Sequence, residues 1–264
     1  MPDRKEKFAD KYGPWALVAG ASEGLGAAFA ESLASRGINL IIIARRREPL
    51  ELLGERLEKK HGITVIARSM DLGDVSGIRE YIDGLSEEIG LLVYNAAYAP
   101  IGLFSRKEES DLMKVPDVNI RAPLLLTKLL TDKMIPRKKG GIILMSSLSG
   151  FQGGPGLSAY SASKAFNTVL AEGLWAEMKK EGIDVMACCA GAVRTPGYST
   201  ASRSKEAPGT LDPQQVAEEA VKALGKGPVY IPGKLNRLFR FILGRLVSRK
   251  KAVKIMEYNT KDLI

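Results

Sequence analysis

Residues 15–26 read Trp15-Ala-Leu-Val-Ala-Gly20-Ala-Ser-Glu-Gly24-Leu-Gly26, five apolar residues followed by a turn that contains three glycines. An apolar run that does not alternate with polar residues is typical of a strand buried on both faces. Glycines tolerate positive φ and let the backbone approach a pyrophosphate, while the N-terminus of the next helix favours an anion. Placed between a strand and an amphipathic helix, the turn predicts a nucleotide site rather than a plain tight turn.

Six more apolar runs follow, separated by longer stretches of helical character. The predicted strands are 15–19, 39–44, 64–67, 91–94, 142–145, 185–189 and 229–231. The predicted helices are 25–35, 49–60, 75–89, 118–134, 158–180 and 213–224, the third of which should stop at Gly90. Because strand and helix alternate, the pattern predicts a Rossmann-like, doubly wound α/β fold: a parallel sheet of about seven strands with helices on both faces.

The chain has 264 residues, a length that fits one large α/β domain. We expect a single domain over residues 1–232 and a basic extension over 233–264. One histidine, His61, and two cysteines, Cys188 and Cys189, are too few for a His/Cys zinc centre, so no metal site is expected. His61 also precedes every plausible serine nucleophile, which excludes the Ser-His-Asp triad of an α/β hydrolase.

Several features favour a reducing, cytoplasmic compartment. Residues 1–13 alternate acidic and basic side chains and lack the apolar stretch of a signal peptide. No apolar run approaches the 18 or so residues of a membrane span. Adjacent cysteines cannot staple a secreted scaffold, so Cys188 and Cys189 are interpreted as small core residues on opposite faces of a strand. His61 is interpreted as a solvated cation at a helix end.

Three arginines follow the second predicted strand, which ends at Ala44. This place, about 20 residues past the glycine turn, carries an acidic residue for the NAD ribose or an arginine for the NADP 2′-phosphate in dinucleotide folds. Arg45 therefore favours NADP, with NAD as the alternative. Glu23 argues the other way, because a carboxylate in the glycine turn would lie near that phosphate.

Ser147 ends the fifth predicted strand, and the next helix opens with Tyr160-Ser-Ala-Ser-Lys164. Residues four apart lie on one face of a helix, so Tyr160 and Lys164 are neighbours. A phenol with a pKa near 10 is a poor acid or base at neutral pH, and a nearby ammonium lowers that pKa. The pair thus predicts reversible proton transfer to a carbonyl oxygen.

These motifs together resemble the classical short-chain dehydrogenase/reductase family from about Trp15 to Ile231. The resemblance implies that Tyr160 is the acid/base, that Ser147 binds the substrate oxygen and that Lys164 holds the nicotinamide ribose. It further implies that Asn119 holds a water in a proton relay. The cofactor contacts that it implies are Gly20, Ser22, Gly24, Leu25, Gly26, Arg45, Asp71, Leu72, Asn95, Tyr160, Lys164, Gly191, Val193 and Thr195.

Two motifs depart from the family pattern. Tyr94-Asn95-Ala96-Ala97 stands in place of Asn-Asn-Ala-Gly, and Ala190-Gly191 stands in place of Pro-Gly. We expect these changes to affect cofactor affinity more than reaction type. The resemblance also implies a homodimer or homotetramer.

Substrate selectivity in this family comes from three loops. Here they hold Tyr98, Pro100, Ile101, Leu103 and Phe104; Phe151, Gln152 and Leu157; and a segment from Gly197 and Tyr198 to Lys205 that has the composition of a mobile lid. The first two loops are mostly apolar, so we expect a neutral, largely apolar ketone or acyl-type carbonyl, reduced with NADPH. Asp111 and Lys114 are interpreted as ordinary exposed charges. The alternative function is a non-catalytic nucleotide-binding regulatory or scaffold protein.

The formal net charge of +9 belongs almost entirely to one segment. Residues 233–254 contain eight Lys and Arg and no acidic residue, and the rest of the chain holds 31 Lys and Arg against 30 Asp and Glu. On a helix, Leu235, Phe239, Ile242 and Leu246 share one face, opposite Lys234, Arg237, Arg240 and Arg245. The apolar face favours packing on the cleft or on another subunit, with peripheral contact to an anionic membrane through 233–254 as the alternative. Nucleic-acid binding is not expected.

Overall fold

The computed structural model describes residues 4–201 and 206–260, in which seven strands form one sheet of order β3-β2-β1-β4-β5-β6-β7. Every neighbouring pair is parallel. The strands are β1 Trp15–Ala19, β2 Asn39–Ala44, β3 Val65–Ser69, β4 Ile89–Tyr94, β5 Gly140–Ser147, β6 Ile183–Ala190 and β7 Val229–Tyr230. The helices are α1 Arg4–Tyr12, α2 Gly24–Ala34, α3 Arg47–His61, α4 Val75–Asp83, α5 Glu109–Pro116, α6 Ala122–Met134, α7 Ser158–Met178, α8 Pro196–Ala201, α9 Pro213–Ala223, α10 Lys234–Arg245 and α11 Arg249–Thr260.

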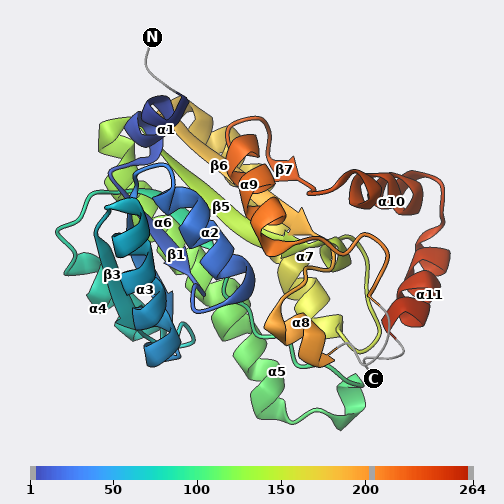
Figure 1. Ribbon diagram of the computed structural model, residues 1–264. Helices are drawn as coiled ribbons and strands as arrows, with labels where there is room; N and C mark the ends of the chain where they lie inside the picture. The colour runs from blue at the N-terminus through green and yellow to red at the C-terminus, as the bar shows by residue number, and fades with distance from the viewer. Residues whose placement is uncertain (1–3, 202–205, 261–264) are drawn as a thin grey trace.

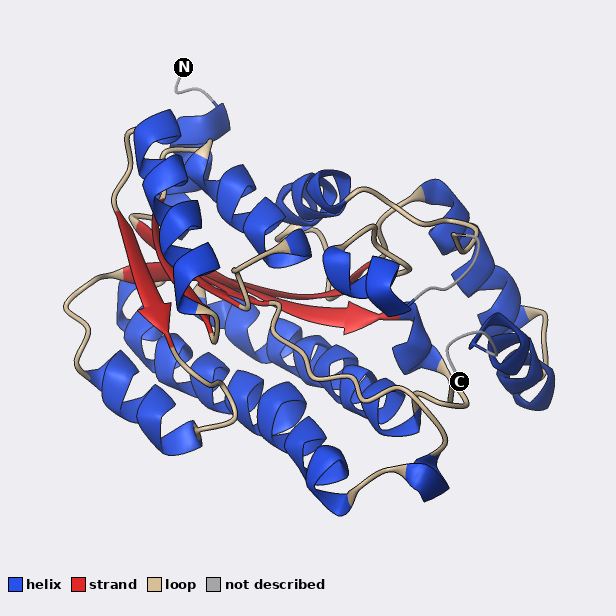
Figure 2. Cartoon of the chain, turned by 60° about the horizontal axis from the view of Figure 1, so that its bottom comes forward, coloured by secondary structure: helices blue, strands red, loops and turns tan. Residues whose placement is uncertain are grey.

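The central strands are apolar along their whole length because both faces of the sheet are covered. In β1, Ala16 and Val18 enter one core cluster with α2, α3 and α9, whereas Leu17 and Ala19 enter the other with α4, α6 and α7. Figure 2 shows the sheet between these two layers of helices. The predicted doubly wound α/β fold is confirmed, and Cys188 and Cys189 divide between the two clusters as expected.

The strand order reverses beside β1, because the chain first builds β2 and β3 on one side and then crosses to β4 on the other. In an open parallel sheet, ligands bind outside the carboxyl ends of the strands at such a reversal. The glycine turn after β1 and the loop after β4 both lie at this point. The fold therefore places the predicted nucleotide turn at the sheet's binding crevice.

Two predicted helices differ from the structure by more than two residues at an end. The helix predicted over 75–89 ends at Asp83, and Gly90 lies inside β4, where a Cβ atom would come within 2.4 Å of the Gly13 carbonyl oxygen. The helix predicted over 118–134 corresponds to α6, which begins at Ala122, and a further helix, α5, precedes it from Glu109. Pro116 has no N–H to donate within that helix, and a π-helical turn over Asp117–Arg121 joins α5 to α6.

Helices α10 and α11 follow β7, in the segment that the sequence separates as an extension. Figures 1 and 2 place them at the β7 end of the molecule, away from β3. None of the helices in the described residues is both long and apolar enough to cross a bilayer.

Candidate active site

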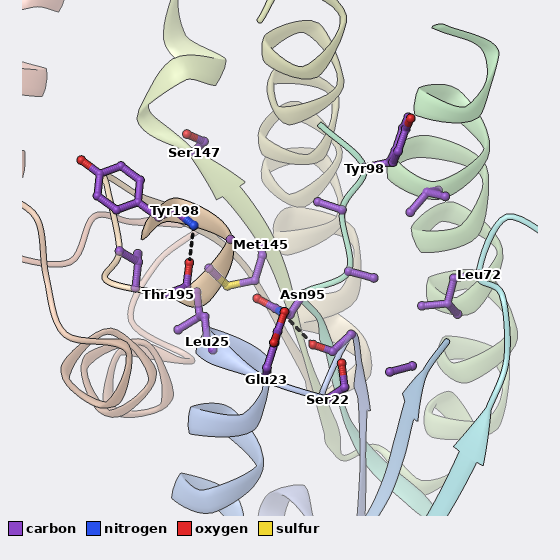
Figure 3. A pocket seen from close by; sticks show the side chains of 18 of the residues that line it. Ser22, Glu23, Leu25, Leu72, Asn95, Tyr98, Met145, Ser147, Thr195 and Tyr198 are labelled. Atoms are coloured by element: carbon purple, nitrogen blue, oxygen red, sulfur yellow. Dashed lines mark hydrogen bonds between the residues drawn. The ribbon is translucent and has the colours of Figure 1, made fainter. Parts of the chain in front are cut away.

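A cleft of about 690 Å³ opens at the carboxyl ends of the strands. It is lined by the turn after β1, the ends of β2 and β5, the loops after β3, β4 and β6, and the first turns of α7. All the predicted site residues line it except Asn119 and Gly26. Figure 3 shows Ser147, Thr195 and Tyr198 on one side, Leu72 and Tyr98 on the other, and Ser22 and Asn95 between them.

Close packing requires the glycines of the first turn. Gly20 has a φ of +83°, and a Cβ atom there would lie 2.6 Å from the Ala96 backbone. A Cβ on Gly26 would lie 1.9 Å from the Gly20 carbonyl oxygen, so Gly26 supports the turn from behind the cleft. Asn95 completes the turn by donating a 2.9 Å hydrogen bond from Nδ2 to that same carbonyl oxygen.

The N-terminus of α2 is free to receive an anion. Glu23 occupies the N-cap position, but its side chain caps no backbone N–H. Its carboxylate instead pairs with Arg46 at 2.8 Å, and Arg46 also donates to the Ser22 hydroxyl at 3.2 Å. The Glu23 carboxylate, which the sequence predicts to lie near the phosphate, is thus neutralised by Arg46. Arg45 lies beside this pair on the cleft wall.

The remaining predicted cofactor residues lie along the same cleft. Asp71 accepts a 2.9 Å hydrogen bond from the Gly73 N–H, and Leu72 is buried beside it. Thr195 packs over Gly24 and accepts from the Tyr198 N–H at 3.2 Å. Gly191 and Val193 form the wall between β6 and Thr195.

Ser147, Tyr160 and Lys164 meet where β5 ends and α7 begins. The Ser147 Oγ atom accepts from the Ser149 hydroxyl at 2.9 Å. Lys164 is 2% exposed, its Nζ atom donates to the Met145 carbonyl at 2.9 Å, and it lies 5.5 Å from the centre of the Tyr160 ring. The three side chains line one wall of the cleft.

The protonation of these groups differs from the sequence-based expectation. Burial raises the pKa of the Tyr160 phenol, and a hydrogen bond with Ser147 opposes the rise. Burial also lowers the pKa of Lys164 to about 8. The expected lowering of the tyrosine pKa by the lysine is therefore wrong for this structure, because desolvation of the phenol outweighs the opposing hydrogen bond with Ser147.

Asn119 lies behind the cleft, within the π-helical turn, and is fully buried. Its side chain binds both backbone groups of Tyr98, at 2.7 and 2.8 Å, and the Ser163 hydroxyl at 2.9 Å. Tyr94, which replaces the family asparagine, donates from its hydroxyl to the Val118 carbonyl at the same turn. Asn119 thus anchors the loop after β4 to α7.

Sequence reasoning did not assign Arg46 or Lys114 to the cleft. Both line it together with Tyr98 of the predicted substrate loop, and the Lys114 ammonium lies 5.2 Å from the centre of the Tyr98 ring. The Tyr98 hydroxyl hydrogen-bonds to Asp111. Asp111 and Lys114 are half-buried rather than ordinary exposed charges, because the unpredicted helix α5 carries them to the loop after β4.

The predicted substrate loops also differ from expectation. Phe151 is covered by Arg240 at 4.0 Å, and its carbonyl accepts from Arg249 at 2.9 Å, so charges from the extension reach this apolar loop. The predicted lid contains α8, whose Tyr198 lines the cleft and accepts a 3.0 Å hydrogen bond from the Ala207 N–H at its hydroxyl. Its part from Ser202 to Lys205 lies outside the described residues. His61 is not simply solvated, since its Nε2 atom lies 2.7 Å from the Glu31 carboxylate.

The residues present fit a dinucleotide. The uncapped N-terminus of α2 suits a pyrophosphate, Arg45 suits a further phosphate, and the Tyr160 and Lys164 pair lies at the far end of the same cleft. The fold and the site together define a dinucleotide-binding α/β oxidoreductase.

Comparison with known proteins identifies the family within this class. The family model of the short chain dehydrogenases matches residues 14–206, and the chain belongs to that family. It is 30% identical over 233 residues to 7beta-hydroxysteroid dehydrogenase of Clostridium sardiniense, covering 87% of this chain and 89% of the relative. It is 32% identical over 225 residues to very-long-chain 3-oxoacyl-CoA reductase-B of Danio rerio, covering 82% and 70%.

A third relative is named as an inactive protein. Inactive hydroxysteroid dehydrogenase-like protein 1 of Mus musculus is 33% identical over 223 residues, covering 81% of this chain and 67% of the relative.

Solved structures agree with the fold. One from work on 7beta-hydroxysteroid dehydrogenase stereoselectivity aligns with a TM-score of 0.87 at 25% identity, covering 94% of this chain and 98% of the other. A short-chain dehydrogenase from Sphingobium yanoikuyae, in complex with NADPH, aligns with a TM-score of 0.79 at 28% identity, covering 89% and 94%.

Proposed function

We propose that this protein is an NADPH-preferring oxidoreductase that reduces a largely apolar ketone or acyl-type carbonyl to a secondary alcohol, or runs the reverse reaction. The observation that carries the proposal is that Ser147, Tyr160 and Lys164 line one cleft with the glycine turn and Arg45. The bound dinucleotide supplies the hydride. The protein supplies orientation and the proton.

Tyr160 is the proposed acid. Because burial raises its pKa, the phenol is protonated at neutral pH and can donate to the substrate oxygen as negative charge develops there. Ser147 hydrogen-bonds the same oxygen, and Lys164 and Asn119 serve as the lysine and asparagine of the proton relay. A neutral phenol favours the reductive direction, since oxidation requires that phenol to lose its proton first.

The NADP preference rests on charge. Arg45 lines the cleft at the end of β2. Arg46 forms an ion pair with the Glu23 carboxylate, which would otherwise repel a 2′-phosphate. The relative from Sphingobium yanoikuyae is a complex with NADPH, which supports the same choice. We take the cofactor contacts to be those predicted from the sequence, with Arg46 added.

The substrate class rests on the relatives and on the apolar cleft walls. Two relatives are named for a hydroxysteroid and for a very-long-chain 3-oxoacyl-CoA. Both names describe a carbonyl or alcohol on a large apolar skeleton.

A panel of cyclic and steroid ketones, 3-oxoacyl thioesters, aldehydes and secondary alcohols, each tested with NADPH and NADH, examines this function. We expect turnover with at least one ketone or alcohol pair, faster with the phosphorylated cofactor. Cofactor binding without turnover across the panel would favour the second candidate, a non-catalytic nucleotide-binding protein. That candidate is kept because one relative is named inactive.

We also propose a homodimer or homotetramer in a reducing compartment such as the cytoplasm. The outer surfaces of α6 and α7 expose Leu124 and Val169, and both cysteines are free and buried. Light scattering on the full chain counts the copies, and a monomer at assay concentration would contradict the assembly.

A further inference from the structure

The outward surface of α10 carries large apolar side chains and cations that are exposed in the described part of the chain. Lys234, Leu238, Phe241 and Arg245 are spaced by one and two helical turns and share a face. Leu238 is 53% exposed, Phe241 58% and Leu246, just beyond the helix, 71%. Exposed apolar side chains gathered in this way mark an interaction surface.

The opposite face of α10 binds the body of the protein. Asn236 is buried and donates to the Gly209 and Pro232 carbonyls, both at 3.1 Å. Arg240, one turn later, stacks on Phe151. On the face predicted to pack on the cleft or on another subunit, Leu235 and Leu246 are exposed and Ile242 is half-buried. The polar side chains of Asn236 and Arg240 therefore anchor the helix and leave most of its apolar side chains outward.

The charge around this surface has one sign. Residues 233–256 contain no acidic side chain. Lys234, Arg245, Lys250, Lys251 and Lys254 are exposed. Within the part of the chain that the structure describes, Arg237 alone of the α10 and α11 cations forms an ion pair, with Glu219 at 3.7 Å. The positive charge is therefore available to an external anion.

We propose that α10 and the start of α11 form a docking surface for an anionic lipid bilayer. Basic residues near such a surface are attracted to its headgroups, while leucine and phenylalanine side chains enter the boundary with the acyl chains. A second copy of the chain fits less well, because a twofold contact would bring the same cations face to face. Helices α10 and α11 also hold the loop after β5 through Arg240 and Arg249, so docking would bring the substrate side of the cleft near the bilayer.

Sedimentation of the full-length protein with vesicles of phosphatidylcholine, with and without phosphatidylserine, tests this proposal. We expect partition to the anionic vesicles to be at least about tenfold stronger than to the neutral ones. Raising the ionic strength from about 0.05 M to about 0.5 M should weaken it, because the Debye length shortens.

Two double variants separate the apolar and charged contributions. Leu238→Ser with Phe241→Ser, and Lys234→Glu with Arg245→Glu, should each reduce partition severalfold. The matched controls Leu52→Ser and Lys59→Glu, both exposed on α3, should bind as the wild type does. NADPH titration of every variant verifies that the fold is intact.

Equal partition to neutral and anionic vesicles, or wild-type partition by both double variants, would overturn the proposal. So would loss of self-association in the variants combined with no vesicle binding by the wild type, because the surface would then be an interface between copies. None of these outcomes depends on turnover, so the docking surface can fail while the proposed function stands.

Discussion

Arg45 and Arg46 stand side by side after β2, yet they have different partners. Arg46 is bound to Glu23 and Ser22, whereas Arg45 lines the cleft with no ion pair among the described residues. This difference supports the proposal that Arg45, rather than Arg46, binds the 2′-phosphate. The sequence places both arginines correctly but cannot say which one the turn carboxylate neutralises.

The variant Arg45→Asp tests that assignment. A charge-assisted hydrogen bond to phosphate contributes about 1.5 to 3 kcal/mol, so the Kd for NADPH should rise roughly tenfold or more while the Kd for NADH changes little. Fluorescence titration measures both constants. Arg47→Asp is the matched control, because Arg47 pairs with Glu51 and does not line the cleft. Tighter binding of NADH than NADPH by the wild type would refute the preference.

Burial of Lys164 in the site lowers the stability of the fold at neutral pH, because a charged ammonium is removed from water. Its pKa is lowered from 10.5 to about 8 by burial, so between these values unfolding takes up a proton. Stability contributed by this residue therefore rises with pH across that window, since the buried charge is lost.

The comparison of wild type with Lys164→Met isolates this effect. The free energy of unfolding of the wild type, relative to the variant, should increase by on the order of 2 kcal/mol between about pH 7 and about pH 10. Denaturant unfolding at each pH gives the difference. A difference that is constant with pH would show that the lysine titrates normally.

At the scale of elements, α2 and α9 are tied on one face of the sheet by a charged cluster. Arg36 on the turn after α2 pairs with Glu218 on α9 at 2.8 Å, and Ser32 donates to the same carboxylate at 2.6 Å. The hydrogen bond from Arg36 is the main reason that the pKa of Glu218 is lowered to about 2. This contact holds the helix that carries the glycine turn against the helix before the extension.

Glu218→Gln should therefore lower stability in a pH-dependent way. A carboxylate with a lowered pKa stabilises the fold above its unfolded pKa, about 4.5, and the contribution is lost as pH falls toward about 2. We expect a loss of about 1 to 2 kcal/mol at neutral pH, because solvent screens this partly exposed pair, and almost none near pH 2. Thermal unfolding measured across this pH range gives the loss of stability. An equal loss at neutral pH and near pH 2 would show that the lowered pKa of Glu218 does not contribute to stability.

The elements that sequence reasoning placed well are those with continuous apolar runs, such as β1 and β2, whose bounds agree with the structure. Helix α5 was not predicted from the sequence, because Pro116 interrupts its pattern. In the structure, a π-helical turn after this proline joins α5 to the next helix. Asp111 and Lys114 were misjudged for the same reason. No local signal reveals that a short helix will carry them to Tyr98.

At the scale of the whole molecule, charge and chemistry separate along the chain. The near-neutral part up to β7 holds the cleft, and the excess of positive charge lies on α10 and α11. The cleft could be predicted because its residues follow strand ends in order. The burial that raises the pKa of Tyr160 and lowers the pKa of Lys164 could not be predicted from the sequence. It depends on how β5, α7 and β6 pack around these two side chains.

The steady-state rate of Tyr160→Phe, measured with an identified ketone and NADPH, shows whether Tyr160 supplies the proton of the reaction. We predict that kcat falls by at least about 100-fold, the scale of general acid catalysis, while the Kd for NADPH stays close to that of the wild type. Tyr81→Phe serves as the control, because its buried hydroxyl has no hydrogen-bond partner among the described residues. Full turnover by Tyr160→Phe would contradict the role of Tyr160 as the acid.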